Sequence, residues 1–367
     1  MFSAADHEFM ARALRLAELG LFSTTPNPRV GCVIVQSGTV IGEGWHRRAG
    51  EAHAETHALL AAGSKARGAT AYITLEPCSH HGRTPPCAEA LLAAGVTRVV
   101  AAMQDPNPQV AGQGMALLAS AGVEAECGLL EAEARELNIG FAARMSRGRP
   151  WLRMKMAASL DGKTALENGV SQWITGAAAR HDGHRWRARA CAILSGIGTV
   201  RDDDPQLNVR AVATSRQPLK VVVDSALELP LESRVLNDGG VLVATASEEC
   251  EKSAALRARG AEVVCFPNAI GKVDLPALLD ELGRRGINEL HVEGGLKTQR
   301  PCWRQGWSMN ADLSAPCLIG NAAHRHVRSA RTLQHWKTVT DWPFAICAWS
   351  APDVRILARF AANERPA

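Results

Sequence analysis

The sequence predicts a protein of two α/β domains, and three observations support this fold class. The chain has 367 residues with 46% hydrophobic content, which is enough for two domains that each bury a core of their own. Residue patterns typical of strands and of helices alternate through both halves, as they do in α/β sheets. A short basic segment rich in turn-forming residues, Arg144–Pro150, lies between the halves, so we expect domains at residues 1–147 and 151–367.

The first half is expected to form a three-layer α/β/α domain. Apolar side chains recur at helical spacing in residues 3–19, where Ser3 or Asp6 is the candidate N-cap, and the two prolines of Thr24–Pro28 then exclude regular structure. The remaining expected elements are a hairpin of strands at 30–35 and 40–45, a helix at 53–62, a strand at 69–75, a helix at 86–94, strands at 96–103 and 123–127, and a long helix at 131–145. Strands and helices in this order form a sheet that is covered on both faces.

The second half is expected to form another α/β sheet. The expected elements are strands at 151–157, 192–196, 221–224 and 289–295 and a helix at 177–190. Open parallel sheets bind small molecules at the loops that follow their strands. Gly198-Thr199 and Gly294-Gly295 offer backbone N–H groups suited to phosphate, but their spacing is not Gly-x-Gly-x-x-Gly and does not by itself identify a nicotinamide site.

His53, Cys78 and Cys87 form a candidate zinc site. One imidazole and two thiols supply three protein ligands and leave the fourth position open for water, as in catalytic zinc sites. Glu55, two residues after the histidine, can face this water and move its protons without binding the metal. His-x-Glu followed by paired cysteines is the pattern of zinc deaminases. The alternatives are a structural zinc or no metal.

The expected helices place these ligands at strand-to-helix junctions. His53 and Cys87 would each lie in the first turn of a helix, where the helix dipole favours a thiolate, and Cys78 would follow the strand between them. His80 and His81 lie between the two cysteines and are either spare ligands or solvated histidines at the edge of the substrate.

Composition disfavours several other classes of protein. The formal net charge is only +4 and no stripe of Lys and Arg is interleaved with aromatic residues, which argues against a nucleic-acid groove. The N-terminus has no basic segment followed by an apolar core, and no apolar run approaches the roughly 18 residues of a membrane span, so we expect a cytoplasmic protein without a membrane partner. Ten cysteines are too few for a disulfide framework in so long a chain, which favours a metal site for the close pair.

Motifs in both halves carry a family resemblance. In the first half they are Pro26-Asn27-Pro28-Arg29-Val30-Gly31, Gly44-Trp45-His46, His53-Ala54-Glu55, Glu76-Pro77-Cys78-Ser79-His80, Gly82-Arg83-Thr84-Pro85-Pro86-Cys87 and Asp105-Pro106-Asn107-Pro108. In the second half they are Ala-Ser-Leu-Asp-Gly at 158–162, Ser-Gln-Trp-Ile-Thr at 171–175, Gly-Thr-Val-x-x-Asp-Asp-Pro at 198–205 and Val-Glu-Gly-Gly at 292–295. Through them the chain resembles the bifunctional deaminase/reductase family of riboflavin biosynthesis. The eight residues between the cysteines differ from the two-residue spacing of most nucleobase deaminases and are similar to this family.

For the first domain, the resemblance implies a cytidine-deaminase-like α/β/α fold, zinc bound by His53, Cys78 and Cys87, and Glu55 as the proton shuttle. It also implies a set of residues that line the substrate pocket, namely Asn27, His46, Arg83, Thr84, Asp105 and Asn107. Arg83 and Thr84 would lie near the ribose phosphate, and an Arg with a hydroxyl in a Gly-containing loop suits a phosphate on chemical grounds as well. Taken alone, Asp105-Pro-Asn-Pro is equally consistent with a turn.

For the second domain, the resemblance implies a dihydrofolate-reductase-like α/β fold and NADPH as the cofactor. The implied cofactor contacts are Ala157, Trp173, Thr199, Asp203, Ser225 and Gly295. The implied substrate contacts are Ser171, Arg187, Leu207, Arg210 and Glu293. Arg187 and Arg210 are well suited to a phosphate, while the cofactor supplies the hydride and the protein aligns the reactants.

The resemblance therefore implies two reactions on a small phosphoribosyl pyrimidine. The first domain would hydrolytically deaminate 2,5-diamino-6-(5-phosphoribosylamino)pyrimidin-4(3H)-one, and the second would reduce the ribosyl group of the product to a ribityl group. We expect no nucleic-acid partner, and we expect a homo-oligomer. Two alternatives stay open: a nucleic-acid-editing zinc deaminase with an appended binding domain, and a non-catalytic partner protein stabilised by zinc.

The family pattern is interrupted near the C-terminus. Residues 298–313 show neither helical nor alternating spacing where the family has a helix and a strand, and residues 321–349 depart again. Five of the nine tryptophans lie after residue 300, which favours paired reading-frame changes in the gene or its recorded sequence over tolerated local divergence. If these stretches are present in the protein, we expect impaired NADPH turnover with deamination intact.

Overall fold

The computed structural model describes residues 1–79, 86–108, 110–158, 173–247, 251–294, 309–316, 344–350 and 353–360. The chain divides into two compact units, Met1–Pro150 with Gly283–Asn288 and Trp151–Leu282 with Glu289–Ala367. Among the helices in the described ranges, none is long and apolar enough to cross a membrane.

The first unit is built on a five-stranded sheet with the order β2-β1-β3-β4-β5. Its strands are β1 (Gly31–Gln36), β2 (Thr39–Trp45), β3 (Thr70–Ile73), β4 (Arg98–Ala101) and β5 (Glu124–Cys127). β1 pairs antiparallel with β2 and β3, whereas β3, β4 and β5 pair in parallel. The expected hairpin and the three later strands are confirmed, although their ends differ by up to two residues from those expected.

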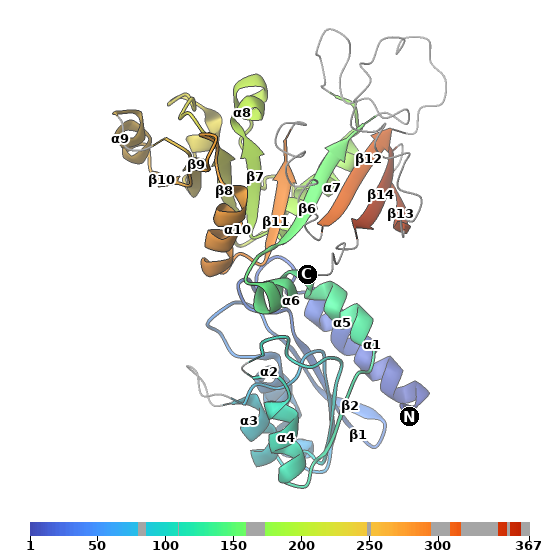
Figure 1. Ribbon diagram of the computed structural model, residues 1–367. Coiled ribbons are helices and arrows are strands. Elements are labelled where there is room, and N and C mark those ends of the chain that lie inside the picture. Colours follow the sequence, from blue (N-terminus) through green and yellow to red (C-terminus); the bar gives the residue numbers. More distant parts are fainter. Residues whose placement is uncertain are drawn as a thin grey trace, which may run out of the picture. The chain divides into compact units, whose positions relative to one another are not determined.

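Helices cover both faces of this sheet. They are α1 (Ala4–Glu18), α2 (Ala54–Ala62), α3 (Cys87–Ala93), α4 (Gln113–Ser120), α5 (Glu131–Leu137) and α6 (Ile139–Arg147). A Cβ at Gly31 would lie 2.0 Å from the Ala13 carbonyl oxygen of α1, and a Cβ at Gly44 would lie 2.3 Å from the Ala54 carbonyl oxygen of α2. Gly44 pairs with Cys32, the neighbour of Gly31, so the two glycines face opposite sides of the sheet. The expected three-layer α/β/α fold is therefore confirmed, with α1 and α2 on opposite faces (Figure 1).

The single long helix expected at 131–145 is wrong, because α5 and α6 meet at a break at Asn138. The buried Asn138 amide accepts the backbone N–H of Arg29 at 2.8 Å and donates to the Arg29 carbonyl oxygen at 2.9 Å. The Arg29 guanidinium in turn donates to the Leu137 carbonyl oxygen at 2.7 Å. These bonds connect the break to the segment that leads into β1. Arg29 lies 109 residues before Asn138 in the sequence, so the helical spacing of residues 131–145 cannot predict the break.

The second unit is built on a nine-stranded sheet with the order β10-β9-β8-β7-β11-β6-β12-β14-β13, which Figure 1 shows from left to right. Its strands are β6 (Trp151–Ala157), β7 (Ala192–Gly196), β8 (Leu219–Val223), β9 (Val241–Thr245), β10 (Ala261–Cys265), β11 (Glu289–Glu293), β12 (Met309–Pro316), β13 (Phe344–Ser350) and β14 (Asp353–Phe360). Neighbours from β10 to β12 are parallel, and β14 is antiparallel to both β12 and β13. The helices of this unit are α7 (Ala177–Arg189), α8 (Ile197–Asp203), α9 (Glu251–Ala258) and α10 (Leu275–Arg284). The expected second α/β sheet is confirmed.

β12 corrects the interpretation that residues 298–313 contain no strand. Met309–Pro316 pairs in parallel with β6 and antiparallel with β14. Its sequence, Met-Asn-Ala-Asp-Leu-Ser-Ala, alternates apolar and polar residues as a strand does, but the aperiodic residues 298–308 before it hide this short run. β13 lies largely within the second atypical stretch, so both stretches contribute a strand to the sheet.

Candidate functional site

The three candidate zinc ligands come from segments at one end of the first unit's sheet. His53 is the N-cap residue of α2, and Cys87 is the first residue of α3. Cys78 lies in the segment that follows β3. The expected strand-to-helix junctions are present, except that His53 lies one position before the first turn of its helix.

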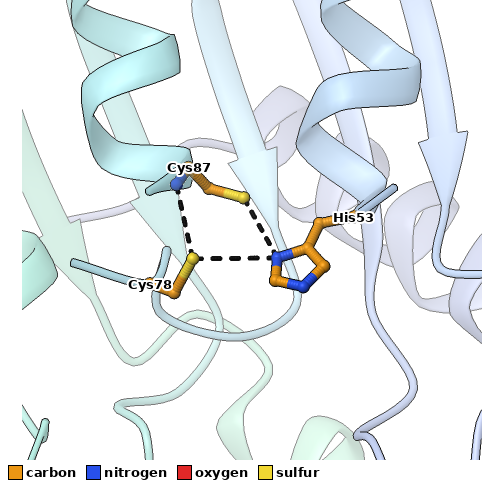
Figure 2. Close-up of side chains that lie close together, drawn as sticks. All are labelled: His53, Cys78 and Cys87. Atoms are coloured by element: carbon orange, nitrogen blue, oxygen red, sulfur yellow. Dashed lines mark hydrogen bonds between the residues drawn. The ribbon is translucent and has the colours of Figure 1, made fainter. Parts of the chain in front are cut away.

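The geometry of these side chains fits a zinc ion. The Nδ1 atom of His53 lies 3.2 Å from Cys87 Sγ and 3.7 Å from Cys78 Sγ, and all three atoms lie within 4.8 Å of one another (Figure 2). In a tetrahedral site with bonds of about 2.0 Å to nitrogen and about 2.3 Å to sulfur, a nitrogen and a sulfur ligand are about 3.6 Å apart. Since both sulfur atoms face Nδ1, this is the imidazole atom that would bind the metal.

The two thiols differ in how readily they lose a proton. A hydrogen bond from the Cys87 thiol lowers the pKa of Cys78 to about 4, and the His53 ring and the Cys87 backbone N–H, 3.3 Å from Cys78 Sγ, lower it further against the effect of burial. The hydrogen bond to Cys78, together with burial, raises the pKa of Cys87. One thiolate is therefore present at neutral pH, and a zinc ion has to displace the proton of one thiol only.

Glu55 lies beside the ligands in the first turn of α2 and is 3% exposed. Burial raises the pKa of its carboxyl group, although its backbone N–H and His53 act in the opposite direction. Within the part of the chain that the structure describes, the group able to hold a metal consists of His53, Cys78 and Cys87 without Glu55. A buried carboxyl group with a raised pKa beside such a site is suited to general acid–base chemistry.

His46 and Asn27 form a hydrogen-bonded pair next to His53. The His46 ring meets the His53 ring edge-on, with the ring centroids 5.4 Å apart. Its Nδ1 lies 3.1 Å from the Ala52 carbonyl oxygen and its Nε2 lies 3.1 Å from Asn27 Nδ2. Burial lowers the pKa of His46, so the neutral ring donates from Nδ1 to Ala52 and accepts from Asn27 at Nε2.

Asp105 and Asn107 lie in the loop after β4, where the Asn107 N–H donates to Asp105 Oδ1 at 2.8 Å. This loop is bound to Glu76, which belongs to one of the family motifs but is not among the predicted site residues. The Asp105 N–H donates to Glu76 Oε2 at 3.0 Å. A carboxylate directly after an apolar strand was the available signal, because a buried charge needs partners.

Several predicted residues lie outside the described residues. They are Arg83, Thr84, His80, His81, Ser171 and Gly295.

In the second unit, predicted residues lie along one edge of the sheet. β6, β7, β8 and β11 are parallel members of one continuous sheet, so their carboxyl ends share an edge. Ala157 ends β6, Thr199 lies in α8 after β7, Ser225 follows β8, and Glu293 ends β11. Open parallel sheets bind dinucleotides at this edge, so the arrangement fits a nucleotide cofactor.

Trp173 and Asp203, the other described residues predicted to contact the cofactor, are both exposed. The Trp173 side chain is 69% exposed, and the Arg180 guanidinium lies 4.6 Å from its ring centroid. Asp203 is the last residue of α8. An exposed indole held in this way can stack against a flat aromatic ligand.

Arg187 and Glu293 form a bidentate ion pair. Arg187 Nη2 lies 2.8 Å from Glu293 Oε2, Nε binds Oε1, and Nη1 donates to the Asn208 carbonyl oxygen at 3.1 Å. Burial alone would raise the pKa of Glu293, but Arg187 holds it well below its usual range. The guanidinium fork of Arg187 is thus engaged by protein groups.

Arg210 is exposed and lies among other cations. Burial and the charges of Arg187 and Arg234 lower the pKa of Arg210. Burial and the charges of Arg187 and Arg210 lower the pKa of His184 to about 4. An anion such as a phosphate would relieve this repulsion. The buried Leu207, three positions earlier, adopts φ 48°, a left-handed conformation that is uncommon for a residue other than glycine.

Comparison with known proteins agrees with both halves of this description. The model of the cytidine and deoxycytidylate deaminase zinc-binding region matches residues 3–103, and the model of the RibD C-terminal domain matches residues 150–343. The riboflavin biosynthesis protein RibD of Escherichia coli is 48% identical over 79% of this chain and 82% of its own. That of Bacillus amyloliquefaciens is 40% identical over 96% of both chains.

Solved structures are similar over nearly the whole chain. RibD of Acinetobacter baumannii, form 1, has a TM-score of 0.84 at 39% identity and covers 97% of this chain and 99% of that chain. A diaminohydroxyphosphoribosylaminopyrimidine deaminase/5-amino-6-(5-phosphoribosylamino)uracil reductase from Thermotoga maritima has a TM-score of 0.82 at 32% identity, with the same coverage.

These comparisons do not support the expected impairment of the reductase. The C-terminal family model continues to residue 343, through the first atypical stretch and most of the second. The B. amyloliquefaciens relative aligns with 96% of the chain, a span that takes in the atypical stretches. The chain therefore belongs to the RibD family and is a bifunctional deaminase and reductase of riboflavin biosynthesis.

Proposed function

We propose that the first domain, residues 1–147, catalyses the zinc-dependent hydrolytic deamination of 2,5-diamino-6-(5-phosphoribosylamino)pyrimidin-4(3H)-one. The observation that carries this proposal is the cluster of His53, Cys78 and Cys87 with the buried Glu55 beside it. The T. maritima relative, whose name includes the matching deaminase activity, supports the choice of substrate.

Glu55 is the proton carrier of the proposed reaction. Zinc, when held by the three ligands, supplies Lewis-acid chemistry that lowers the pKa of a water molecule to about 7. The Glu55 carboxylate takes one proton from the attacking water and delivers it to the ring nitrogen, and it then carries the remaining hydroxyl proton to the departing amine. The oxygen of water bonds to the carbon that carried the amino group, the C–N bond breaks, and ammonia leaves. The raised pKa of Glu55 suits a group that must both accept and release this proton near neutral pH.

The remaining residues of the first site hold the substrate. Asn27 is oriented by His46, and the Asp105–Asn107 turn is held by its own internal hydrogen bond, so these groups can present fixed donors and acceptors to the pyrimidine. We assign Arg83 and Thr84 to the ribose phosphate on the strength of their chemistry and the family resemblance.

The second domain, residues 151–367, then reduces the ribosyl group of the product to a ribityl group with NADPH. The cofactor, when bound at the carboxyl edge of the sheet, supplies the hydride. Ala157, Trp173, Thr199, Asp203 and Ser225, together with Gly295, would hold it. Ser171, Arg187, Leu207, Arg210 and Glu293 would contact the substrate, with Arg187 fixing Glu293 and the exposed Arg210 open to the phosphate. The name of the T. maritima relative supports this reaction as well.

A Glu55→Gln variant tests the proposed deaminase. The amide keeps the size of the side chain but cannot accept and return a proton, so we expect unchanged zinc content and a fall in ammonia release of about 10²- to 10⁴-fold. Ammonia is measured with the free phosphoribosyl pyrimidine and, separately, with RNA. Undiminished ammonia release by the variant would refute the role of Glu55, and release from RNA would favour a nucleic-acid-editing enzyme instead.

A cytoplasmic location and a homo-oligomeric state stay predictions. Sedimentation analysis of the full-length chain measures the second directly.

A further inference from the structure

Glu76 is a buried carboxylate that is bound entirely by backbone N–H groups. Its side chain is 5% exposed and accepts four hydrogen bonds. Oε2 accepts from Asp105 at 3.0 Å and Gly112 at 2.9 Å. Oε1 accepts from Gly114 at 2.8 Å and Met115 at 3.3 Å. Among the described residues no cationic side chain forms an ion pair with it, so peptide dipoles alone balance its charge.

The first turn of α4 also packs closely against Pro77, the residue before Cys78. A Cβ at Gly114 would lie 1.9 Å from the Pro77 carbonyl oxygen, so only glycine permits this approach. The first turn of α3 binds Cys78 as well. The Cys87 N–H donates to Cys78 Sγ at 3.3 Å, and the Ala88 N–H donates to the Cys78 carbonyl oxygen at 3.2 Å. Cys78 is therefore fixed between α3 and the contact of α4 with Glu76 and Pro77.

The same carboxylate holds the loop that carries the predicted pyrimidine contacts. One of its four bonds ends at the Asp105 N–H, and Asp105 in turn accepts from Asn107. The Glu76 backbone N–H adds a bond to the Met103 carbonyl oxygen at 2.9 Å, just before this loop. One side chain thus connects a metal ligand two residues away with the loop expected to bind the substrate.

We propose that Glu76 is a positioning residue that sets the place of Cys78 and of the Asp105–Asn107 loop together. This inference rests on the proposed zinc-dependent deaminase. Glu76 acts through its neighbours: it keeps the Cys78 sulfur at the distance from His53 and Cys87 that a tetrahedral ion requires. Residues that orient metal ligands in this way typically change metal affinity by about 10- to 100-fold when replaced.

A Glu76→Gln variant is the sharpest test, because it keeps the size of the side chain. Each carboxylate oxygen accepts two N–H groups, so an amide NH₂ in either position would face two donors and lose both bonds. We expect the zinc dissociation constant to rise about 10- to 100-fold and KM for the pyrimidine to rise with it. Zinc affinity is measured by competition with a chromophoric chelator, and the ligand geometry by the thiolate-to-metal absorption of the cobalt-substituted protein.

An Asp6→Asn variant is the matched control. Asp6 is also a buried carboxylate of the first unit with several hydrogen bonds, but its partners are Ser3, Tyr72 and Arg98, none of them at the metal site. We expect it to lower thermal stability while zinc affinity and the cobalt spectrum stay as in the wild type.

The outcomes separate this inference from the proposed function. Weakened zinc binding and an altered cobalt spectrum in Glu76→Gln alone support the positioning role. Equal zinc affinity in wild type, Glu76→Gln and Asp6→Asn, with stability lowered in both variants, makes Glu76 merely structural and leaves the proposed deaminase standing. A wild-type protein that binds no zinc overturns both. If Glu76→Gln does not fold, Glu76→Asp keeps the charge but is too short to reach both pairs of donors, and wild-type zinc affinity in that variant overturns the inference.

Discussion

At the scale of single residues, Asp6 joins the first helix of the first unit to its sheet. Ser3 is the N-cap of α1 and forms a capping box with Asp6. The Ser3 hydroxyl oxygen accepts the backbone N–H of Asp6, and the Asp6 carboxylate accepts the backbone N–H of Ser3. Asp6 also accepts from the Tyr72 hydroxyl of β3 at 2.6 Å and from the Arg98 guanidinium of β4 at 2.7 Å. Burial alone would raise the pKa of Asp6, but the hydrogen bonds from Arg98, Tyr72 and Ser3 hold it well below its usual range.

This lowered pKa predicts how stability depends on pH. The unfolded chain binds the proton of Asp6 near pH 4 and the folded chain only at lower pH. The contribution of Asp6 is therefore fully present above about pH 4 and is lost as the pH falls below it. In Asp6→Asn we expect the free energy of unfolding to be about 3 kcal/mol lower at pH 7. We also expect it to decrease less steeply than in the wild type as the pH falls below about 4. Urea unfolding at a series of pH values measures both, and curves that stay parallel for wild type and variant would count against this account.

Some residues of the candidate site could be predicted from the sequence and others could not. His53, Cys78, Cys87 and Glu55 were found because metal ligands and a proton shuttle demand particular residue types at short, recognisable spacings. The role of Glu76 was missed because its partners are backbone N–H groups up to 39 residues away, and a backbone N–H has no signature in the sequence.

At the scale of the elements, hydrophobic periodicity identified most strands and helices of the first unit, but it gave no prediction of α4 and merged α5 and α6 into one helix. Residues 131–145 have continuous helical spacing, yet Asn138 breaks them into α5 and α6. The bonds between Asn138 and Arg29 are a tertiary interaction that overrides local preference. No local pattern contains this information, because the two residues meet only after the chain has folded.

An Asn138→Ala variant tests the importance of this break. The substitution removes both hydrogen bonds that the Asn138 amide makes with the buried backbone of Arg29, so we expect a loss of about 2 to 4 kcal/mol in the free energy of unfolding. Ser146→Ala on α6 is the control, since it removes an exposed hydrogen bond to Ala142 and should change stability by less than about 0.5 kcal/mol. Chemical denaturation measures both variants. Equal stability of the two would mean that the Asn138 bonds do not hold α5 and α6 in place.

At the scale of the whole molecule, alternation of strands and helices predicted both α/β sheets, but the C-terminal part was harder to interpret. β12 lies directly after an aperiodic stretch, and a window wide enough to detect a helix dilutes the seven alternating residues of this strand. The strand order of the second sheet, in which β11 lies between β7 and β6, also depends on long-range pairing that spacing cannot reveal.

The assignment of one reaction to each domain predicts that the two activities can be removed separately. Arg187→Ala deprives the partly buried Glu293 of its bidentate partner, so we expect reduction of the deaminated substrate to fall by about 100-fold or more. Ammonia release by the same preparation should stay within about twofold of wild type, because the proposed deaminase residues all belong to the other domain. Glu55→Gln should show the reverse pattern. Loss of both activities from either single substitution would contradict the division.

The central claim, that His53, Cys78 and Cys87 hold a zinc ion that makes this chain a deaminase, is tested most directly by zinc content and ammonia release measured on one preparation. We expect about one zinc per chain, loss of ammonia release from the phosphoribosyl pyrimidine when a chelator removes the metal, and recovery when zinc is returned. Full ammonia release by protein shown to contain no metal would contradict the claim.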